Sequence, residues 1–392
     1  MKPIAFFSSN LVIAAILLTA FVGCSDDQLM PSSEPQSSQG TTYLVEKKTE
    51  PLIREMEGIE RIANTADGGL GYWTEGAFVE LPAGSFDALA DAIAAAGSGG
   101  IVLVRSGMHT ESDGVAITNG VRIVGESGAI LQIASDSYSA YPTTFDPALH
   151  VVGATGRVVV WGLEIIPQGE VGGIALLLED SPDVVVGKNT IRDFEMGIYV
   201  QHADNARIYG NTIESTTLWQ TGEVADGGGI TVANGENVSM MKNDFSLAIF
   251  NVWICGTTGL YMKNSTHDGY IGVILCKVPE GVYFLPNGES AASQQSGNGF
   301  LLAENSSTTN FAEGYLVIDG ANNNLLLNNR ASSNGTYDIE LAGDFYRFGF
   351  LTPACFENVA IVGSNSVVIK NCGNDNTVVG GSLVDNELDP CY

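Results

Sequence analysis

The eight residues VVVGKNTI at positions 184–191 recur three more times further along the chain. The later copies are ARIYGNTI at 206–213, VSMMKNDF at 238–245 and GLYMKNST at 259–266. Their asparagines are separated by 22, 32 and 21 residues, so the middle interval is one period plus about ten extra residues. A period near 22, with β-branched residues alternating around Gly and Asn, predicts a solenoid of short strands, and the longer interval predicts a loop insertion.

The composition is that of a folded chain with a large core. The 392 residues are 45% hydrophobic, and the 47 glycines are what a fold of short strands and turns requires. The formal net charge of −28 disfavours nucleic acid as a partner, because binding it relies on Lys and Arg. A polyanionic substrate would need a local basic patch or a bridging cation.

The N-terminus carries a targeting signal. Residues 1–23 combine Lys2 with a mostly apolar run, and small residues precede Cys24. The run FVGC at 21–24 resembles a bacterial lipobox, which implies acylation of Cys24 and attachment to a membrane through the lipid. Ser25 after this Cys implies sorting to the outer membrane or cell surface. The alternative is a simple secretory signal, and either interpretation makes the protein extracytoplasmic.

Two segments separate this signal from the repeats. Residues 24–50 are rich in Ser, Gln and Pro and predict a disordered tether. Residues 51–99 predict a cap region with a helix over 86–96, in which Ser85 is the N-cap and Gly97 ends the helix. Its apolar face would be Phe86, Leu89, Ala90 and Ile93, and we expect it to close the first rung of the solenoid.

Residues 100–392 predict the solenoid itself, with the insertions 214–228 and 277–299. The amphipathic helix, the GGIVLV run at 99–104 and the strand VRIVG at 121–125 are similar to the entry of the pectin-lyase-like right-handed parallel β-helix. The resemblance extends over about residues 85–384. It implies an all-β fold and leaves activity open, because this fold carries lyases, hydrolases, epimerases, adhesins and non-enzymes.

Aligning the repeats on their asparagines assigns side chains to columns that alternate between the core and the outside. The columns predicted to face inward are Ile198, Val252, Val273 and Val200, Ile254, Leu275. Those predicted to face outward are Ala175, Tyr199, Thr231, Trp253, Ile274 and Leu177, Gln201, Ala233, Cys255, Cys276. The outward aromatic residues Tyr199 and Trp253 are candidates for stacking on a sugar ring, and a loop covering them is the structural alternative.

Cys255 and Cys276 lie 21 residues apart, one period, in the same column. Adjacent rungs are about 4.8 Å apart, which a disulfide can span, so either a disulfide between rungs or a stacked pair of thiols is expected.

Polar columns accompany the apolar ones. Stacked amides that bond to one another and to turn backbone are expected from the asparagines 189, 211, 243, 264, 329 and 371. Lys188, Lys242 and Lys263 each precede one of these asparagines. They form a thin basic row that is either solvated or in contact with an anionic glycan.

The insertion 214–228 holds the remaining site candidates. Glu223 and Asp226 could act as general acid and base or as calcium ligands, and Trp219 could bind substrate. Plain solvated charge is the alternative for both carboxylates. No other cofactor is evident, and the four His residues lack the spacing of a metal site.

The sequence therefore favours a surface-anchored β-helix lipoprotein that binds or processes extracellular polysaccharide. The outward column lacks the Lys or Arg base of a lyase and the clustered Asp of a hydrolase, so whether the protein is an enzyme stays open. The rival hypothesis is a non-enzymatic structural, adhesion or periplasmic accessory protein.

Overall fold

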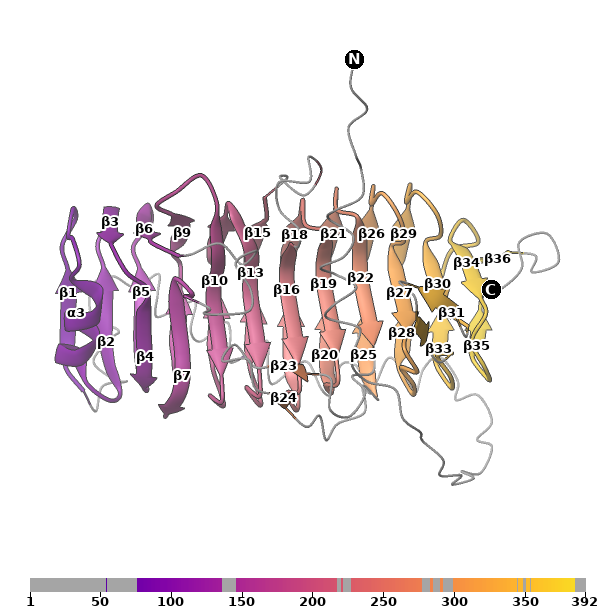
Figure 1. The fold of residues 1–392 in the computed structure, drawn as a ribbon, viewed down its shortest axis with the longest axis horizontal. Coiled ribbons are helices and arrows are strands. Elements are labelled where there is room, and N and C mark those ends of the chain that lie inside the picture. Colours follow the sequence, from indigo (N-terminus) through magenta and orange to yellow (C-terminus); the bar gives the residue numbers. More distant parts are fainter. Residues whose placement is uncertain are drawn as a thin grey trace, which may run out of the picture.

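In the computed structural model the strands stack along one long axis and form a solenoid (Figure 1). The structure describes residues 76–135, 146–216, 227–276, 299–343 and 354–384, together with a few isolated positions and two short strand pairs. Those pairs are antiparallel: β23 (Tyr283–Phe284) with β24 (Ser290–Ala291), and β31 (Phe345–Arg347) with β32 (Phe350–Thr352). No helix in the described part of the chain is long and apolar enough to cross a membrane.

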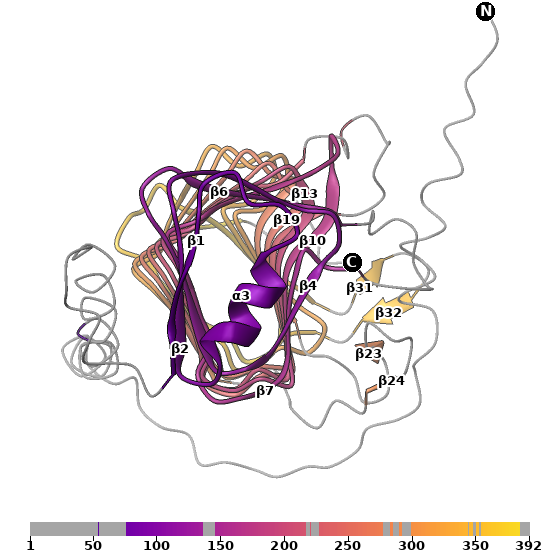
Figure 2. The same ribbon diagram turned by 90° about the vertical axis from the view of Figure 1, so that its left-hand side faces the viewer.

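Three parallel sheets, here called A, B and C, form the sides of the solenoid (Figure 2). Sheet A contains β1 (Phe78–Leu81), β2 (Gly100–Val104), β5 (Val121–Gly125), β8 (Val159–Trp161), β11 (Val185–Gly187), β14 (Arg207–Tyr209), β17 (Val238–Met241), β20 (Gly259–Met262), β25 (Phe300–Ala303), β28 (Leu325–Leu327), β33 (Val359–Ile361) and β35 (Thr377–Val379). Sheet B contains β3 (Gly107–Glu111), β6 (Ala129–Ile133), β9 (Glu164–Pro167), β12 (Thr190–Arg192), β15 (Thr212–Glu214), β18 (Asp244–Ser246), β21 (Ser265–His267), β26 (Ser306–Thr308) and β29 (Arg330–Ser332). Sheet C contains β4 (Val115–Asn119), β7 (Leu149–Thr155), β10 (Gly172–Glu179), β13 (Phe194–Gln201), β16 (Gly228–Ala233), β19 (Phe250–Cys255), β22 (Ile271–Cys276), β27 (Tyr315–Ile318), β30 (Ile339–Leu341), β34 (Val368–Asn371) and β36 (Ser382–Leu383).

The strand order confirms the predicted fold class. Each strand pairs in parallel with the strand one rung away, and successive rungs visit sheets A, B and C in turn, as in a right-handed parallel β-helix. The inward columns are confirmed as well. Ile198, Val252 and Val273 are at most 1% exposed, and they belong to one apolar core that runs from the first rung to the last.

The cap helix α3 (Leu89–Ala96) lies across the N-terminal end of the solenoid (Figure 2). It begins three residues later than predicted, because Asp87 adopts a left-handed backbone conformation (φ 49°), and the ring of Phe86 is 65% exposed. Ala90 is exposed too, and the buried face is Leu89, Ala92, Ile93 and Ala96.

Ser85 does not cap this helix. Its hydroxyl is within 2.7 Å of His109 Nδ1, on strand β3. The cap comes instead from Glu111 of the same strand, whose buried carboxylate accepts hydrogen bonds from the N–H groups of Ala88 and Leu89 at 3.1 and 2.9 Å. Burial raises the pKa of Glu111, while these two hydrogen bonds act in the opposite direction. A carboxylate at this end also complements the helix dipole.

An asparagine ladder runs along the corner between sheets A and B. In each step, the backbone N–H and the Nδ2 of one asparagine donate to the Oδ1 of the next, at 2.9 to 3.2 Å. The ladder is Asn189, Asn211, Asn243, Asn264, Asn305 and Asn329, and all six are nearly fully buried. The residue before each asparagine has a positive φ between 51° and 61°, and Lys188, Lys242 and Lys263 occupy three of these positions.

The prediction for Asn371 is wrong. This residue ends strand β34 of sheet C, opposite Leu341, and does not belong to the A–B corner. Asn305, which the repeat count passed over, takes a place in the ladder instead. A second ladder, Asn324, Asn358 and Asn376, precedes the last strands of sheet A. A third contains Asn310 and Asn334 at the corner between sheets B and C, described below.

Candidate functional site

The outer face of sheet C holds the residues that the sequence proposed as a sugar-stacking stripe. The register aligns Leu177, Tyr199, Thr231, Trp253 and Ile274 in one column. Glu179, Gln201, Ala233, Cys255 and Cys276 form the next. The prediction placed Ala175 in the column that Leu177 occupies, and Leu177 in the column that Glu179 occupies, an error of two residues along β10. The cause is that Ala175 lies opposite Gly197, so alignment on the preceding glycine shifts β10 by two residues against β13.

Both aromatic side chains of this column are at least partly buried. Tyr199 is only 9% exposed, and Trp253 is partly buried, with the Phe250 ring edge-on at 5.2 Å. The indole N–H of Trp253 points at the sulfur atoms of Cys255 and Cys276, at 2.7 and 3.0 Å. The roles of Tyr199 and Trp253 in substrate binding stay predictions.

Cys255 and Cys276 are register partners on β19 and β22, with their Cα atoms 4.6 Å apart, and the structure joins them in a disulfide. Cys372 is disulfide-bonded too, whereas Cys355 is a buried free thiol whose pKa is raised to about 12 by burial. Cross-links of this kind are what an extracytoplasmic protein is able to keep.

The site candidates of the first insertion lie outside the described residues. The insertion leaves the solenoid after β15 and returns at β16, which places its two ends at the corner between sheets B and C. Trp219, Glu223 and Asp226 are not among the described residues, so their roles stay predictions. The second insertion, 277–299, lies between β22 and β25, and its possible position over sheet C is likewise outside the described part.

Further along the same corner lies an aromatic pair that the repeat pattern does not predict, in which Phe311 is exposed and Tyr270 is partly buried. The rings of Tyr270 and Phe311 are stacked, with centroids 5.5 Å apart and planes 25° from parallel. Phe311 is 73% exposed, the most open large apolar side chain in the described part of the chain. The backbone hydrogen bonds between rungs place Tyr270, Phe311 and Gly335 in one column. Because Gly335 has no side chain, the face of Phe311 turned away from Tyr270 is left uncovered.

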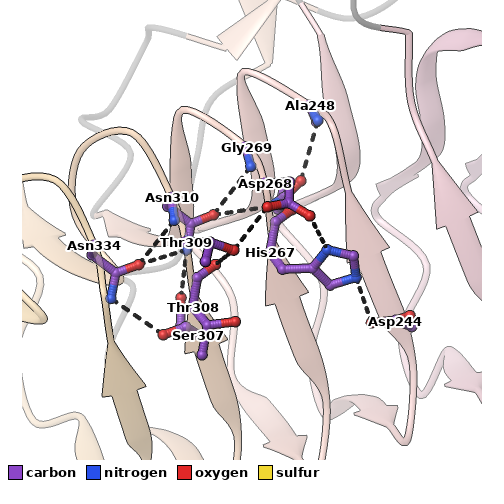
Figure 3. Close-up of polar contacts among 11 residues, drawn as sticks. Asp244, Ala248, His267, Asp268, Gly269, Ser307, Thr308, Thr309, Asn310 and Asn334 are labelled. Atoms are coloured by element: carbon purple, nitrogen blue, oxygen red, sulfur yellow. Dashed lines mark hydrogen bonds and ion pairs between the residues drawn. The ribbon is translucent and has the colours of Figure 1, made fainter.

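Asp268 lies two residues before Tyr270 on the same turn, and Figure 3 shows its polar contacts with His267 and Thr309. His267, at the end of β21, lies between two carboxylates: Nδ1 is 2.8 Å from Asp268, and Nε2 is 3.4 Å from Asp244 of the preceding rung. Thr309, from the following rung, donates its hydroxyl proton to Asp268 at 2.8 Å. Three successive rungs are thus linked by one polar network.

The network sets the charges of its members. Partial burial acts to lower the pKa of His267, but the hydrogen bond to Asp268 and the negative charges of Asp244 and Asp268 outweigh it and raise the pKa. The hydrogen bond from His267, and then the one from Thr309, lower the pKa of Asp268. Asp244 and Asp268 remain 47% and 55% exposed at their side chains, so their oxygens can still accept hydrogen bonds from a ligand.

The third asparagine ladder fixes the backbone beneath this turn (Figure 3). The Nδ2 of Asn251 donates to Oδ1 of Asn310, and the Nδ2 of Asn310 donates to Oδ1 of Asn334, at 3.2 and 2.9 Å. The same Oδ1 of Asn310 accepts the N–H of Gly269, directly before Tyr270. Buried amides thus hold the exposed pair on a rigid support, as a binding site needs.

No metal site is visible among the described residues, because no three His, Cys, Asp or Glu side chains lie close enough together to hold an ion. Calcium binding by Glu223 and Asp226 is not tested by this observation, because both residues lie outside the part that the structure describes. On strands β7 and β10 of sheet C, His150 Nε2 lies 2.9 Å from a carboxylate oxygen of Glu179.

The three parallel sheets and their strand order define a right-handed parallel β-helix protein. No family model and no curated protein sequence matches the chain. Among solved structures it is similar to the periplasmic alginate epimerase AlgG, at 13% identity over 74% of this chain and 76% of that one, with a TM-score of 0.46. It is also similar to DFA-IIIase from Arthrobacter chlorophenolicus A6, at 13% identity over 75% of this chain and 77% of that one, with a TM-score of 0.47. A third similar structure is a family 28 exopolygalacturonase from Yersinia enterocolitica, at 9% identity over 81% of this chain and 70% of that one, with a TM-score of 0.43.

Proposed function

We propose that this protein binds extracellular polysaccharide along the corner between sheets B and C. The observation that carries the proposal is the open ring of Phe311, which is stacked on Tyr270 and uncovered on the side of Gly335. Pyranose rings have apolar C–H faces edged by hydroxyl groups, so they fit a flat aromatic ring beside hydrogen-bond acceptors. Asp268 supplies such an acceptor on the same turn, and Asp244 supplies a second one at the start of strand β18, within 3.4 Å of His267.

The position of the first insertion supports this proposal. Its two ends lie at the same corner, so Trp219, Glu223 and Asp226 belong to a segment that starts and finishes along the surface that carries Phe311. A chain of sugars is long and linear, and a corner that repeats every rung offers it successive contacts at about 4.8 Å intervals. Binding is the function proposed here, and processing would need a catalytic group supplied by that insertion.

Replacing Phe311 by alanine is expected to weaken glycan binding by about tenfold, because stacking on one aromatic ring contributes about 1–1.5 kcal/mol. The measurement is affinity electrophoresis against a panel of immobilised uronate and neutral glycans. Phe86→Ala is the matched control, since Phe86 is also exposed (65%) but lies at the far N-terminal end. Equal retention of the Phe311→Ala variant and the unaltered protein would rule out this corner. Retention on no glycan at all would favour the structural or adhesion alternative.

We also propose that Cys24 is lipidated and anchors the protein at the outer membrane or cell surface. The support is the FVGC run at 21–24, followed by a Ser- and Pro-rich tether up to residue 50. Cells grown with an alkyne-bearing fatty acid should label the unaltered protein and leave the Cys24→Ser variant unlabelled. The variant should also move from the membrane fraction to the soluble fraction. Label on both proteins would contradict acylation at this cysteine.

A further inference from the structure

Two polar side chains on the outer face of sheet C are buried. Gln201 ends β13 and is 0% exposed, and Thr231 lies on β16 and is 6% exposed. Their chain neighbours Val200 and Val232 belong to the apolar core, so alternation along each strand turns both polar side chains outward. Gln201 and Thr231 are therefore buried on the outside of the solenoid, away from its core.

Neither side chain has a hydrogen-bond partner among the described residues. The carbonyl oxygen and the amide nitrogen of Gln201 are both unpaired, and so is the hydroxyl of Thr231. Gln201 lies in register between Glu179, which is 2.9 Å from His150, and Ala233, which has no polar side-chain atom. Buried polar groups without partners destabilise a free protein, so their presence calls for an explanation, and a ligand that supplies the partners is one.

A third side chain of this kind lies directly after β16. Asn234 is 7% exposed, and neither its Oδ1 nor its Nδ2 is paired in the described part of the chain. The register and the backbone hydrogen bonds between rungs place it in one column with Asp180 and His202. Those two side chains already contact each other, with Asp180 Oδ1 3.4 Å from His202 Nδ1. We call Gln201, Thr231 and Asn234 the polar triplet.

The polar triplet borders an apolar wall. Strands β10, β13 and β16 lie side by side in sheet C (Figure 1), and Ile174, Leu177, Met196 and Tyr199 form one buried cluster on the first two of them. Tyr199 is the register partner of Thr231 and precedes Gln201 by two residues on the same strand. An apolar wall beside a few fixed polar groups is the usual composition of a binding site for a small molecule or a sugar unit.

The chemistry of the polar triplet fits a neutral sugar. All three groups can donate and accept hydrogen bonds, and each of the two carboxamides presents an oxygen beside an NH₂ group, which suits adjacent hydroxyl groups of a pyranose. Strands β7, β10, β13 and β16 contain no Lys or Arg, so a uronate or a phosphate would find no such cation on them. His150 and His202, which lie nearby, are each in contact with a carboxylate.

We propose that Gln201, Thr231 and Asn234 bind a sugar unit of a neutral glycan on the outer face of sheet C. This site is separate from the corner that carries Phe311, so the inference does not depend on glycan binding there. It also makes the absence of basic side chains from these four strands a basis for selectivity, because an anionic glycan would lose its hydration without gaining a cationic partner.

Calorimetric titration of the full chain tests the proposal. The neutral probes are cellohexaose, mannohexaose, xylohexaose and maltohexaose, and the anionic probe is hexagalacturonate. We expect a neutral probe to bind about tenfold more tightly than hexagalacturonate, and Gln201→Met and Thr231→Val each to weaken that binding by about tenfold. Both replacements keep the shape of the side chain and remove unpaired buried atoms, so each should raise the melting temperature of the free protein by about 2–4 °C.

Thr266→Val is the matched control for stability. Thr266 is 0% exposed and its hydroxyl donates to Ser307 at 2.8 Å, so the same replacement there should lower the melting temperature. A comparable fall in both Gln201→Met and Thr231→Val would overturn the proposal, because it would show that these groups stabilise the free protein.

The binding data give two further ways to overturn the proposal. One is that no neutral probe binds. The other is that Gln201→Met and Thr231→Val bind a neutral probe as tightly as the unaltered protein does. Phe311→Ala keeps the two sites distinct: loss of binding in that variant alone would support the corner between sheets B and C and exclude the polar triplet, whereas loss in the triplet variants alone would do the reverse.

Discussion

Replacing Asn243 by alanine is expected to lower the free energy of unfolding by about 3–5 kcal/mol. Asn243 is 2% exposed and stands in the middle of the A–B ladder. Its Oδ1 accepts both the N–H and the Nδ2 of Asn211, and its own Nδ2 donates to the carbonyl of Ile208 at 2.9 Å. Alanine would remove these three hydrogen bonds and leave the buried N–H of Asn211 without its acceptor, whereas the Nδ2 of Asn211 keeps its bond to the carbonyl of Val186 at 2.9 Å. An unpaired buried donor costs about 1–3 kcal/mol, and each further lost hydrogen bond costs about 0.5–1.5 kcal/mol.

Chemical denaturation followed by far-UV circular dichroism measures this loss. Asn237→Ala is the control, because Asn237 also bonds an asparagine of the neighbouring rung but is exposed to solvent. Its effect should be about 1 kcal/mol, mostly from placing alanine at φ 56°. Similar losses for the two variants would show that the buried ladder contributes no more than a surface amide pair.

Replacing Gly259 by alanine should strongly destabilise the rungs on either side of it. A Cβ at this position would lie 1.9 Å from the carbonyl oxygen of Val238 and 2.8 Å from its carbonyl carbon, both of which are backbone atoms. Gly259 is the register partner of Val238, so the two rungs would have to separate and break their hydrogen bonds. The backbone there also has φ +154°, which side chains rarely adopt. We expect a loss of at least about 4 kcal/mol, or no folded protein.

Gly153→Ala separates the clash from the backbone conformation. Gly153 has φ +53°, and nothing lies within 4 Å of a Cβ placed on it. This control should lose only about 1 kcal/mol, the usual cost of a left-handed alanine. The yield of folded protein and the melting temperature provide the comparison. Equal stability of the two variants would contradict the close approach of β17 and β20.

The fold was predictable because the buried ladder imposes a requirement on every rung. An asparagine at the A–B corner accepts hydrogen bonds from the rung before and donates hydrogen bonds to the rung after. The sequence therefore repeats an asparagine wherever this corner is regular. Counting failed where the chain departs from the repeat. The insertion 277–299 lengthens the step from Asn264 to Asn305 to 41 residues, which hid Asn305, and the same count then assigned Asn371 to the wrong corner.

The exposed aromatic pair was harder to predict, because turn residues do not follow the strand pattern that defines the columns. Tyr270 and Phe311 are 41 residues apart, and the same insertion lies between them. A signal was present in the spacing: Tyr270 and Phe311 lie six positions after the ladder asparagines Asn264 and Asn305, and Gly335 lies six positions after Asn329, one rung later. Only the stacking of the rungs shows that this glycine leaves the ring of Phe311 uncovered.

The two ends of the solenoid differ, and this difference limits assembly. Helix α3 closes the first rung, whereas β35 and β36 are edge strands with Val379 and Leu383 49% and 60% exposed. A strand edge can recruit another strand edge, and a body with such an edge at both ends would polymerise into a fibre. Because α3 covers the core at the N-terminal end, association through the exposed edges β35 and β36 would join two copies tail to tail.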